Sequence, residues 1–254
     1  MRSGDSNSFE RFQGAFHNLE GHFHILERPV PVELQMEYFK YSETLRRKNN
    51  PPRPLSEEEC KGMYDTLRMD DMVSEADKKY LLSQLATSRC VQSYRLLEEY
   101  SRTPDPEVAD WACMALMESR ISLEAVFSEE KQIYISSGLG GKGEKLRFYV
   151  LLLSKGHIPF KEYQRQTIER EFAFYLSKAN CDIERLTIGE QYVELVFLLP
   201  FRAEIKSTLD RVIEECNQYG DFLSGVVLIS NVKELTFDEV ADIINKDENN
   251  KASD

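Results

Sequence analysis

The 254-residue sequence has few of the features that mark membrane, secreted or disulfide-stabilised proteins. Its longest apolar runs are far shorter than the roughly 20 residues that a membrane-spanning helix needs, and its polar start lacks the apolar core of a signal peptide. Its five cysteines are scattered, with none of the CxxC or Cys/His spacings that zinc sites use. We therefore expect a cytoplasmic protein with reduced thiols, no membrane association, and no bound metal or cofactor.

Positive charge is also scarce, because 32 Lys and Arg residues stand against 44 Asp and Glu residues and the net charge is −12. Nucleic-acid-binding domains usually have a basic face and a high pI, so this composition speaks against nucleic acid as a partner. Hydrophobic residues make up 41% and aromatic residues 11% of the chain, which is enough for sizeable cores. At this length, two domains are the better expectation.

The second half of the sequence shows an ordered alternation of strand and helix patterns. This order is typical of an α+β sandwich in which two helices pack on one face of a roughly five-stranded sheet of ferredoxin-like strand order. One alternative stays open, because the first strand either forms a hairpin with the start of the second or belongs to a different strand order. The predicted strands cover residues 133–136, 146–153, 183–188, 192–199 and 226–229, and the predicted helices cover 160–179 and 202–219.

The first half of the sequence reads mainly as helix. Ser56 and Glu59 have the spacing of a capping box at a helix start, and Asp105 before Pro106 suits the cap of another helix. Aromatic residues from Phe9 onward recur at helical spacing and predict a further amphipathic helix. The predicted segments are an N-terminal stretch ending in a basic, proline-rich linker (1–54), a helical domain (55–127), an α+β sandwich domain (128–246) and a polar tail (247–254).

One stretch of the first half resembles a known repeat family. Two Leu and two Glu at 96–99 precede Pro-Asp-Pro-Glu-Val at 104–108, and Ala-x-x-Ala-Leu follows at 112–116. Over residues 74–127 this pattern resembles the inter-helix turn of HEAT-type α-solenoid repeats, although Ala109 stands where those repeats commonly carry a basic residue. The resemblance implies a helical surface that binds other proteins. A plain helical subdomain is the alternative, because a solenoid needs several repeats and no second copy of the turn exists.

A glycine-rich loop is the first candidate site. Gly138, Gly140 and Gly143 fit GxGxxG, but a strand rather than a helix follows, so the dinucleotide fingerprint is rejected. Glu144 stands where a phosphate-binding P-loop needs Lys, so that motif is rejected too. Glycine leaves the backbone free to point several N–H groups at one anion, and nearby cations would add to the attraction. The loop therefore still predicts a contact with a partner or an anion. The alternative is a solvated hairpin loop. The candidate residues are Gly138, Gly140, Gly141, Lys142, Gly143, Lys145 and Arg147.

The four histidines offer weaker signals. His22 and His24 place two imidazoles on one face of a strand, a spacing that metals can use, but no third His or Cys ligand lies nearby in sequence. A structural or solvent-facing role is therefore favoured for both. His157 lies at a strand-to-helix corner without an identifiable nucleophile, so turn geometry explains it. The sequence predicts no catalytic residue, no metal ligand and no cofactor-binding residue.

These observations favour a non-enzymatic, intracellular protein-interaction or regulatory protein, an adaptor, whose partner is another protein or a second copy of the chain. Two other classes stay open. One is a small-molecule-sensing α+β domain with a pocket lined by Tyr163, Tyr175 or Tyr219. The other is an accessory factor of an RNA–protein assembly, which would need a continuous basic face. The residues of that face would be Arg46, Arg47, Lys48, Arg53 and the loop lysines.

Overall fold

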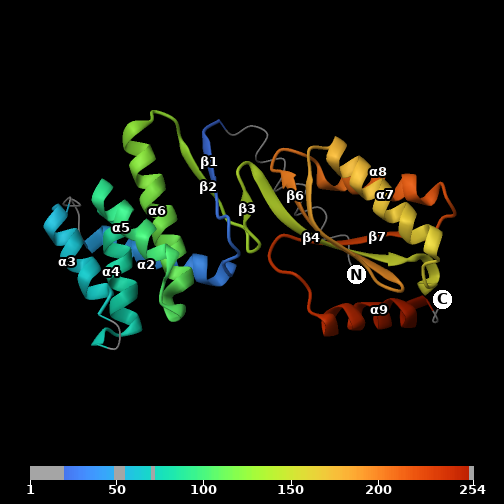
Figure 1. Cartoon of the computed structure of the whole chain (residues 1–254), viewed down its shortest axis with the longest axis horizontal. Helices are drawn as coiled ribbons and strands as arrows, with labels where there is room; N and C mark the ends of the chain where they lie inside the picture. The colour runs from blue at the N-terminus through green and yellow to red at the C-terminus, as the bar shows by residue number, and fades with distance from the viewer. Residues whose placement is uncertain (1–19, 49–54, 70–71, 252–254) are drawn as a thin grey trace. The chain divides into compact units, whose positions relative to one another are not determined.

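The computed structural model describes residues 20–48, 55–69 and 72–251 (Figure 1). Chain contacts divide the protein into two compact units, which we name the helical unit and the sandwich unit. The helical unit comprises Glu20–Leu26 and Val30–Ser136, and among the described residues the sandwich unit comprises Glu27–Pro29 and the chain from Ser137 onward. The aromatic helix predicted from Phe9 onward falls almost entirely outside the described residues. The predicted domain boundaries stay predictions, because folding of isolated fragments would be needed to test them.

The helical unit is built from helices whose starts follow short local signals. The predicted capping box is confirmed: Ser56 Oγ accepts from the backbone N–H of Glu59 at 3.2 Å, and Glu59 Oε2 accepts from the N–H of Ser56 at 2.8 Å. Ser74 caps the next helix by accepting from the N–H of Asp77 at 3.2 Å. The elements are α2 (Val32–Lys48), α3 (Glu57–Leu67), α4 (Glu75–Thr87), α5 (Val91–Arg102), the 3-10 turn η2 (Pro106–Val108) and α6 (Ala109–Phe127).

Helix α2 occupies a stretch that the sequence predicted to be poorly defined. Arg46, Arg47 and Lys48, which the sequence placed in a linker, form its last turn. Cations are favourable there because the C-terminal end of a helix carries partial negative charge. The helical stretch therefore begins before the proline-rich segment rather than after it.

Asp105 does not act as the predicted side-chain cap. It occupies the residue before Pro106 in extended conformation, but its carboxylate forms no capping hydrogen bond. The carboxylate instead accepts from the hydroxyl of Tyr100 at 2.8 Å and lies 2.8 Å from Nζ of Lys78. Burial raises the pKa of Asp105, but the hydrogen bonds from Lys78 and Tyr100 outweigh it and hold the pKa below its usual value. The negative charge of Asp105 thus balances the positive charge of the buried Lys78.

The helices pack as one bundle around a common core, and the predicted HEAT-type resemblance is wrong. Helix α4 contacts α3, α5 and α6, while α2 packs against both α4 and α6. In a HEAT solenoid each helical repeat would contact only its neighbours in the stack. Trp111 lies in the core with 1% of its surface exposed. The largest buried side chains packed with it in this core are Tyr38, Leu67, Leu82, Leu85, Leu97, Tyr100 and Met114.

A small parallel sheet completes the helical unit. Strand β1 (His22–Ile25) pairs with β2 (Gln132–Ile135), with His22 opposite Gln132 and His24 opposite Tyr134. Parallel neighbours need a long crossover connection, which the helices α2 to α6 supply. Of the two alternatives left open for residues 133–136, the hairpin with the strand beginning near 146 is therefore ruled out, because β2 pairs with β1.

The sandwich unit confirms the α+β class. Strand β4 pairs antiparallel with β6 on one side and with β7 on the other, and β5 pairs with β6, so the order is β7-β4-β6-β5. Strand β3 forms a short hairpin with the start of β4. The elements are β3 (Gly141–Lys142), β4 (Lys145–Ser154), the 3-10 turn η3 (Lys155–His157), α7 (Glu162–Lys178), β5 (Asp182–Ile188), β6 (Tyr192–Pro200), α8 (Ile205–Asn217), β7 (Leu223–Ser230) and α9 (Phe237–Lys251).

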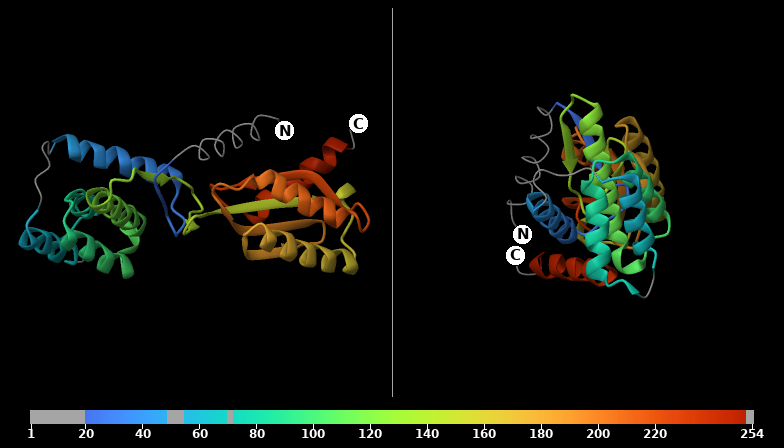
Figure 2. Two further views of the ribbon diagram at one scale, coloured as in Figure 1. Left: turned by 90° about the horizontal axis from the view of Figure 1, so that it is seen from above. Right: turned by 90° about the vertical axis from the view of Figure 1, so that its left-hand side faces the viewer.

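Both faces of this sheet are covered by helices. Tyr149 and Leu151 of β4 pack in one apolar cluster with Val240 of α9. Because side chains alternate along a strand, Phe148 and Val150 point to the opposite face, where α7 and α8 lie side by side (Figures 1 and 2). The start of α9 also has a capping box, in which Thr236 and Glu239 exchange hydrogen bonds of 2.9 and 3.3 Å.

The cysteines of the chain form no disulfide bond. All five cysteines lie in the described part of the chain and are free. Burial raises the pKa of Cys60 and Cys216 to about 12, so both behave as small apolar side chains rather than reactive thiols. None of the helices in the described ranges is long and apolar enough to cross a membrane.

Candidate metal centre

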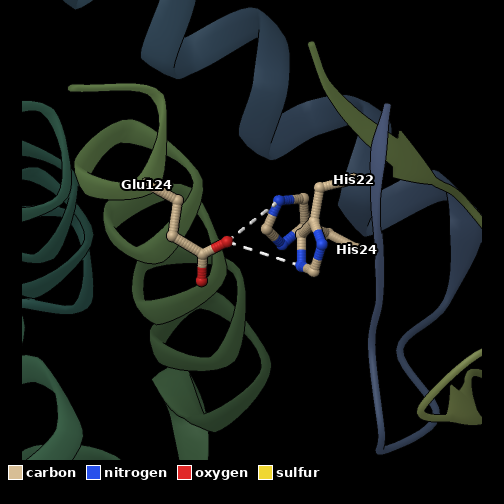
Figure 3. A group of neighbouring side chains, drawn as sticks. All are labelled: His22, His24 and Glu124. Atoms are coloured by element: carbon tan, nitrogen blue, oxygen red, sulfur yellow. Dashed lines mark ion pairs between the residues drawn. The ribbon is translucent and has the colours of Figure 1, made fainter. Parts of the chain in front are cut away.

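Two histidines project from β1 toward the end of helix α6 (Figure 3). His22 and His24 are two residues apart, so the alternation of a strand places both imidazoles on the same face. Gly21 allows this strand to begin close to β2, because a Cβ at that position would lie 2.2 Å from the carbonyl oxygen of Lys131. The next N–H, that of His22, donates to the same oxygen at 2.9 Å.

Glu124 supplies a carboxylate from the last turn of α6. Its Oε2 lies 3.5 Å from Nε2 of His22 and 3.6 Å from Nε2 of His24. The C-terminal end of a helix carries partial negative charge, so a carboxylate there is unfavourable unless a cation balances it. The position therefore favours a bound cation.

The distances fit a shared ion. Two ligand atoms, each about 2.1 Å from a tetrahedral zinc ion, lie about 3.4 Å apart. The His22–Glu124 and His24–Glu124 distances are close to this value, and the three ligand atoms all lie within 4.8 Å of one another. Closing the remaining distance between the two imidazoles would need a rotation of His22, whose side chain is 54% exposed.

The cluster combines one buried side chain with two accessible ones. The side chain of His24 is only 3% exposed, whereas that of Glu124 is 40% exposed. Two imidazole nitrogens and one carboxylate oxygen are ligands that zinc and related transition metals prefer. Three such ligands leave one position of a tetrahedral set to be filled.

The sequence pointed to the two histidines but missed Glu124, the third member of the cluster. His22 and His24 were assigned a structural or solvent-facing role because no other ligand was near in sequence. Glu124 comes from a distant helix, and nothing in its local sequence distinguishes it from the many exposed glutamates of the chain. Only the crossover between β1 and β2 brings the two segments together.

The structure packs the first part of the predicted glycine-rich site into the sandwich unit. A Cβ on Gly138 would lie 2.0 Å from the carbonyl oxygen of Val232, so only glycine fits there. The N–H of Leu139 donates to the carbonyl oxygen of Asn231 at 3.0 Å. Gly140 and Gly141 are buried, whereas Gly143 is open to solvent with a positive φ of 57°.

The cations of that site are mostly paired with carboxylates. Arg147 binds both oxygens of Glu184, at 2.5 and 2.8 Å, and Lys145 lies 2.7 Å from Asp182. Lys142 is exposed at the rim of a pocket of about 480 Å³. The same pocket is also lined by Glu144, Asp182 and Glu184, so its charge is mixed. The loop thus brings cations and anions together.

The two other candidate arrangements meet contrary observations. Tyr163 and Tyr219 are 48% and 52% exposed, as surface residues are, rather than enclosed in a binding pocket. In the helical unit, Arg46 pairs with Glu118 and Arg47 with Glu43, so these cations do not form a basic face. Lys145 and Arg147 are likewise paired. Arg53 lies outside the described residues.

No protein-family model matches the chain, and no curated protein matches it by sequence. Among solved structures, a proposed transposase from Deinococcus radiodurans R1 matches 41% of this chain and 90% of its own, at 12% identity and a TM-score of 0.34. A REP-associated tyrosine transposase bound to a REP hairpin matches 44% of this chain and 65% of its own, at 12% identity and a TM-score of 0.32. A homoserine dehydrogenase from Thiobacillus denitrificans matches 50% and 29%, at 12% identity and a TM-score of 0.23.

These matches correct several predictions made from the sequence. The matched structures are two transposases and a dehydrogenase rather than HEAT proteins or adaptors, so the predicted non-enzymatic interaction protein and its two alternatives are withdrawn. The predictions of a protein partner and against nucleic acid are withdrawn as well, because one matched structure is bound to a REP hairpin. TM-scores this low transfer no activity or ligand to this chain, so function has to be argued from its own residues.

Proposed function

We propose that this protein binds a divalent transition-metal ion, with zinc as the first choice, through His22, His24 and Glu124. The observation that supports the proposal is the convergence of three ligand atoms from two separate elements within 4.8 Å. Exposed acidic groups often cluster without a metal, but two imidazoles on a fixed strand are a more specific arrangement.

The chemistry of the ligands selects the class of ion. Imidazole nitrogen suits zinc, copper, nickel and iron, whereas calcium and magnesium prefer sites made of oxygen ligands. The single carboxylate of Glu124 would offset part of the charge of a divalent ion. In return, the ion would neutralise a carboxylate that lies at the unfavourable end of α6.

Calorimetric titration of the purified chain with zinc tests the proposal. We expect one zinc per chain at this site, and at least about tenfold weaker binding for His22→Ala and for Glu124→Gln. Glu129→Gln is the matched control, because Glu129 is an exposed glutamate close in sequence to Glu124. It should bind zinc like the wild type. Wild-type affinity in both ligand variants, or no zinc binding by the wild type, would refute the proposal.

Four sequence-based predictions are kept as proposals beside this one. The β7-β4-β6-β5 order supports a ferredoxin-like description of the sheet, and the free cysteines support a cytoplasmic location. Exposed Lys142 and open Gly143 support the glycine-rich loop as an anion contact. The domain boundaries near residues 54, 127 and 246 are the fourth, and limited proteolysis would locate them.

A further inference from the structure

A fourth polar side chain reaches the candidate metal centre from β2. The Oε1 atom of Gln132 lies 2.7 Å from Nε2 of His24, the same nitrogen that faces Glu124. Gln132 is paired with His22 in the β1–β2 register, so its backbone position is set by the sheet and not by a loop.

The orientation of this amide is determined by a second hydrogen bond. The Nε2 atom of Gln132 donates to the carbonyl oxygen of Glu130 at 3.0 Å. The amide nitrogen is therefore used, and the amide oxygen must be the atom that faces His24. An acceptor oxygen is thus held against the imidazole nitrogen that the proposed metal site needs.

We infer that Gln132 is the fourth ligand of this metal centre, through its amide oxygen. The inference rests on the proposed function and specifies the donor set: two imidazole nitrogens, one carboxylate oxygen and one amide oxygen. Such a set suits a borderline divalent ion such as Zn²⁺ or Co²⁺, whereas Cu(I) would select sulfur ligands.

The pair formed by His24 and Gln132 has to open only slightly to admit an ion. On metal binding, the ion would take the place of the proton between His24 Nε2 and Gln132 Oε1, and that proton would move to Nδ1 of the same imidazole. The two atoms would move from 2.7 Å to about 3.4 Å apart. Gln132 is partly exposed and has the side-chain freedom for this shift. The ion would then join three elements, because its ligands come from β1, β2 and α6.

Zinc and cobalt titrations of two variants test the inference. Gln132→Leu removes the oxygen at similar size and should weaken zinc binding about 10- to 100-fold. Gln132→Glu replaces the amide oxygen by a carboxylate oxygen and should bind zinc at least as tightly as the wild type. The visible spectrum of the cobalt-loaded protein reports the ligands directly. It should change in Gln132→Leu, where water takes the vacated position.

The outcomes separate this inference from the proposed function. If the wild type binds zinc, and Gln132→Leu binds it equally well, Gln132 is not a ligand although the His-His-Glu site stands. If Gln132→Leu binds more weakly with an unchanged cobalt spectrum, Gln132 only orients His24, and the inference is also overturned. If the wild type binds no zinc, the proposed function itself fails. Weaker binding with a changed spectrum, restored in Gln132→Glu, supports the inference.

Discussion

In the core of the helical unit, the hydroxyl of Tyr38 donates a 2.5 Å hydrogen bond to Oε2 of Glu118, 80 residues away. Both side chains are buried. The other carboxylate oxygen accepts from Ser42 Oγ at 2.5 Å and is paired with Arg46. Burial, followed by the negative charge of Glu118, raises the pKa of Tyr38 well above its ordinary value, so the phenol keeps its proton and remains a donor.

Tyr38→Phe should therefore destabilise the helical unit by about 1–3 kcal/mol, because it removes one donor from a buried carboxylate. Trp111 is the sole tryptophan and lies in this unit, so its fluorescence during urea unfolding follows the helical unit alone. Tyr80→Phe is the control, since Tyr80 is 43% exposed and its hydroxyl should contribute under about 0.5 kcal/mol. Equal midpoints for the two variants would show that the Tyr38–Glu118 bond adds no stability.

The Arg147–Glu184 pair predicts a pH dependence for the sandwich unit. Hydrogen bonds from Arg147 hold the pKa of Glu184 below its ordinary value of 4.5, despite partial burial. A carboxyl with a lowered pKa stabilises the fold above the ordinary pKa, and this contribution is lost as the pH falls through the lower, folded value. The urea midpoint of Glu184→Gln should lie below that of the wild type at pH 7 and approach it near about pH 3. If the difference in urea midpoint between the two proteins stayed the same across this pH range, the prediction would be contradicted. Glu214→Gln, at an exposed glutamate, serves as the control.

Two glycines should respond in opposite directions to alanine. At Gly138 an added Cβ would meet the carbonyl oxygen of Val232 at 2.0 Å, so Gly138→Ala should destabilise by about 1–3 kcal/mol. Gly62 lies inside α3 with no atom within 4 Å of an added Cβ, so Gly62→Ala should stabilise by about 0.5–1 kcal/mol. Chemical denaturation of both variants measures the signs. If Gly138→Ala left the free energy of unfolding unchanged, the loop at residue 138 would be able to move away from Val232.

Zinc should stabilise the helical unit in a pH-dependent way. A ligand at a concentration of about 100 times its Kd stabilises the folded state by about 2.7 kcal/mol, which would appear as a higher Tm in Trp111 fluorescence. Protons compete with metal for imidazole nitrogens, so the zinc-induced rise in Tm should be larger at pH 7.5 than at pH 5.5. The Glu124→Gln variant should lose most of this zinc-induced rise in Tm at both pH values. A rise of the same size in that variant would place the zinc elsewhere on the chain.

Features carried by neighbouring residues could be predicted from the sequence. The capping boxes at Ser56 and Thr236 depend on hydrogen bonds between residues three apart, which form wherever that spacing meets a helix start. The apolar run that became β4 and the amphipathic pattern of α8 depend only on the period of each element. The α+β class followed from the order of these elements.

Features that join distant residues depended on the tertiary structure. The sequence around β2 does not indicate which strand it pairs with. Its parallel partner, β1, is separated from it in the sequence by all the helices of the bundle. Arg147 and Lys145 appeared available to an anion until the pairing of β4 with β6 and of β6 with β5 placed carboxylates beside them. Glu124 joins His22 and His24 for the same reason: side chains far apart in sequence meet only when packed helices and sheets fix their backbones, and the sequence spacing of ligands says nothing about that distance.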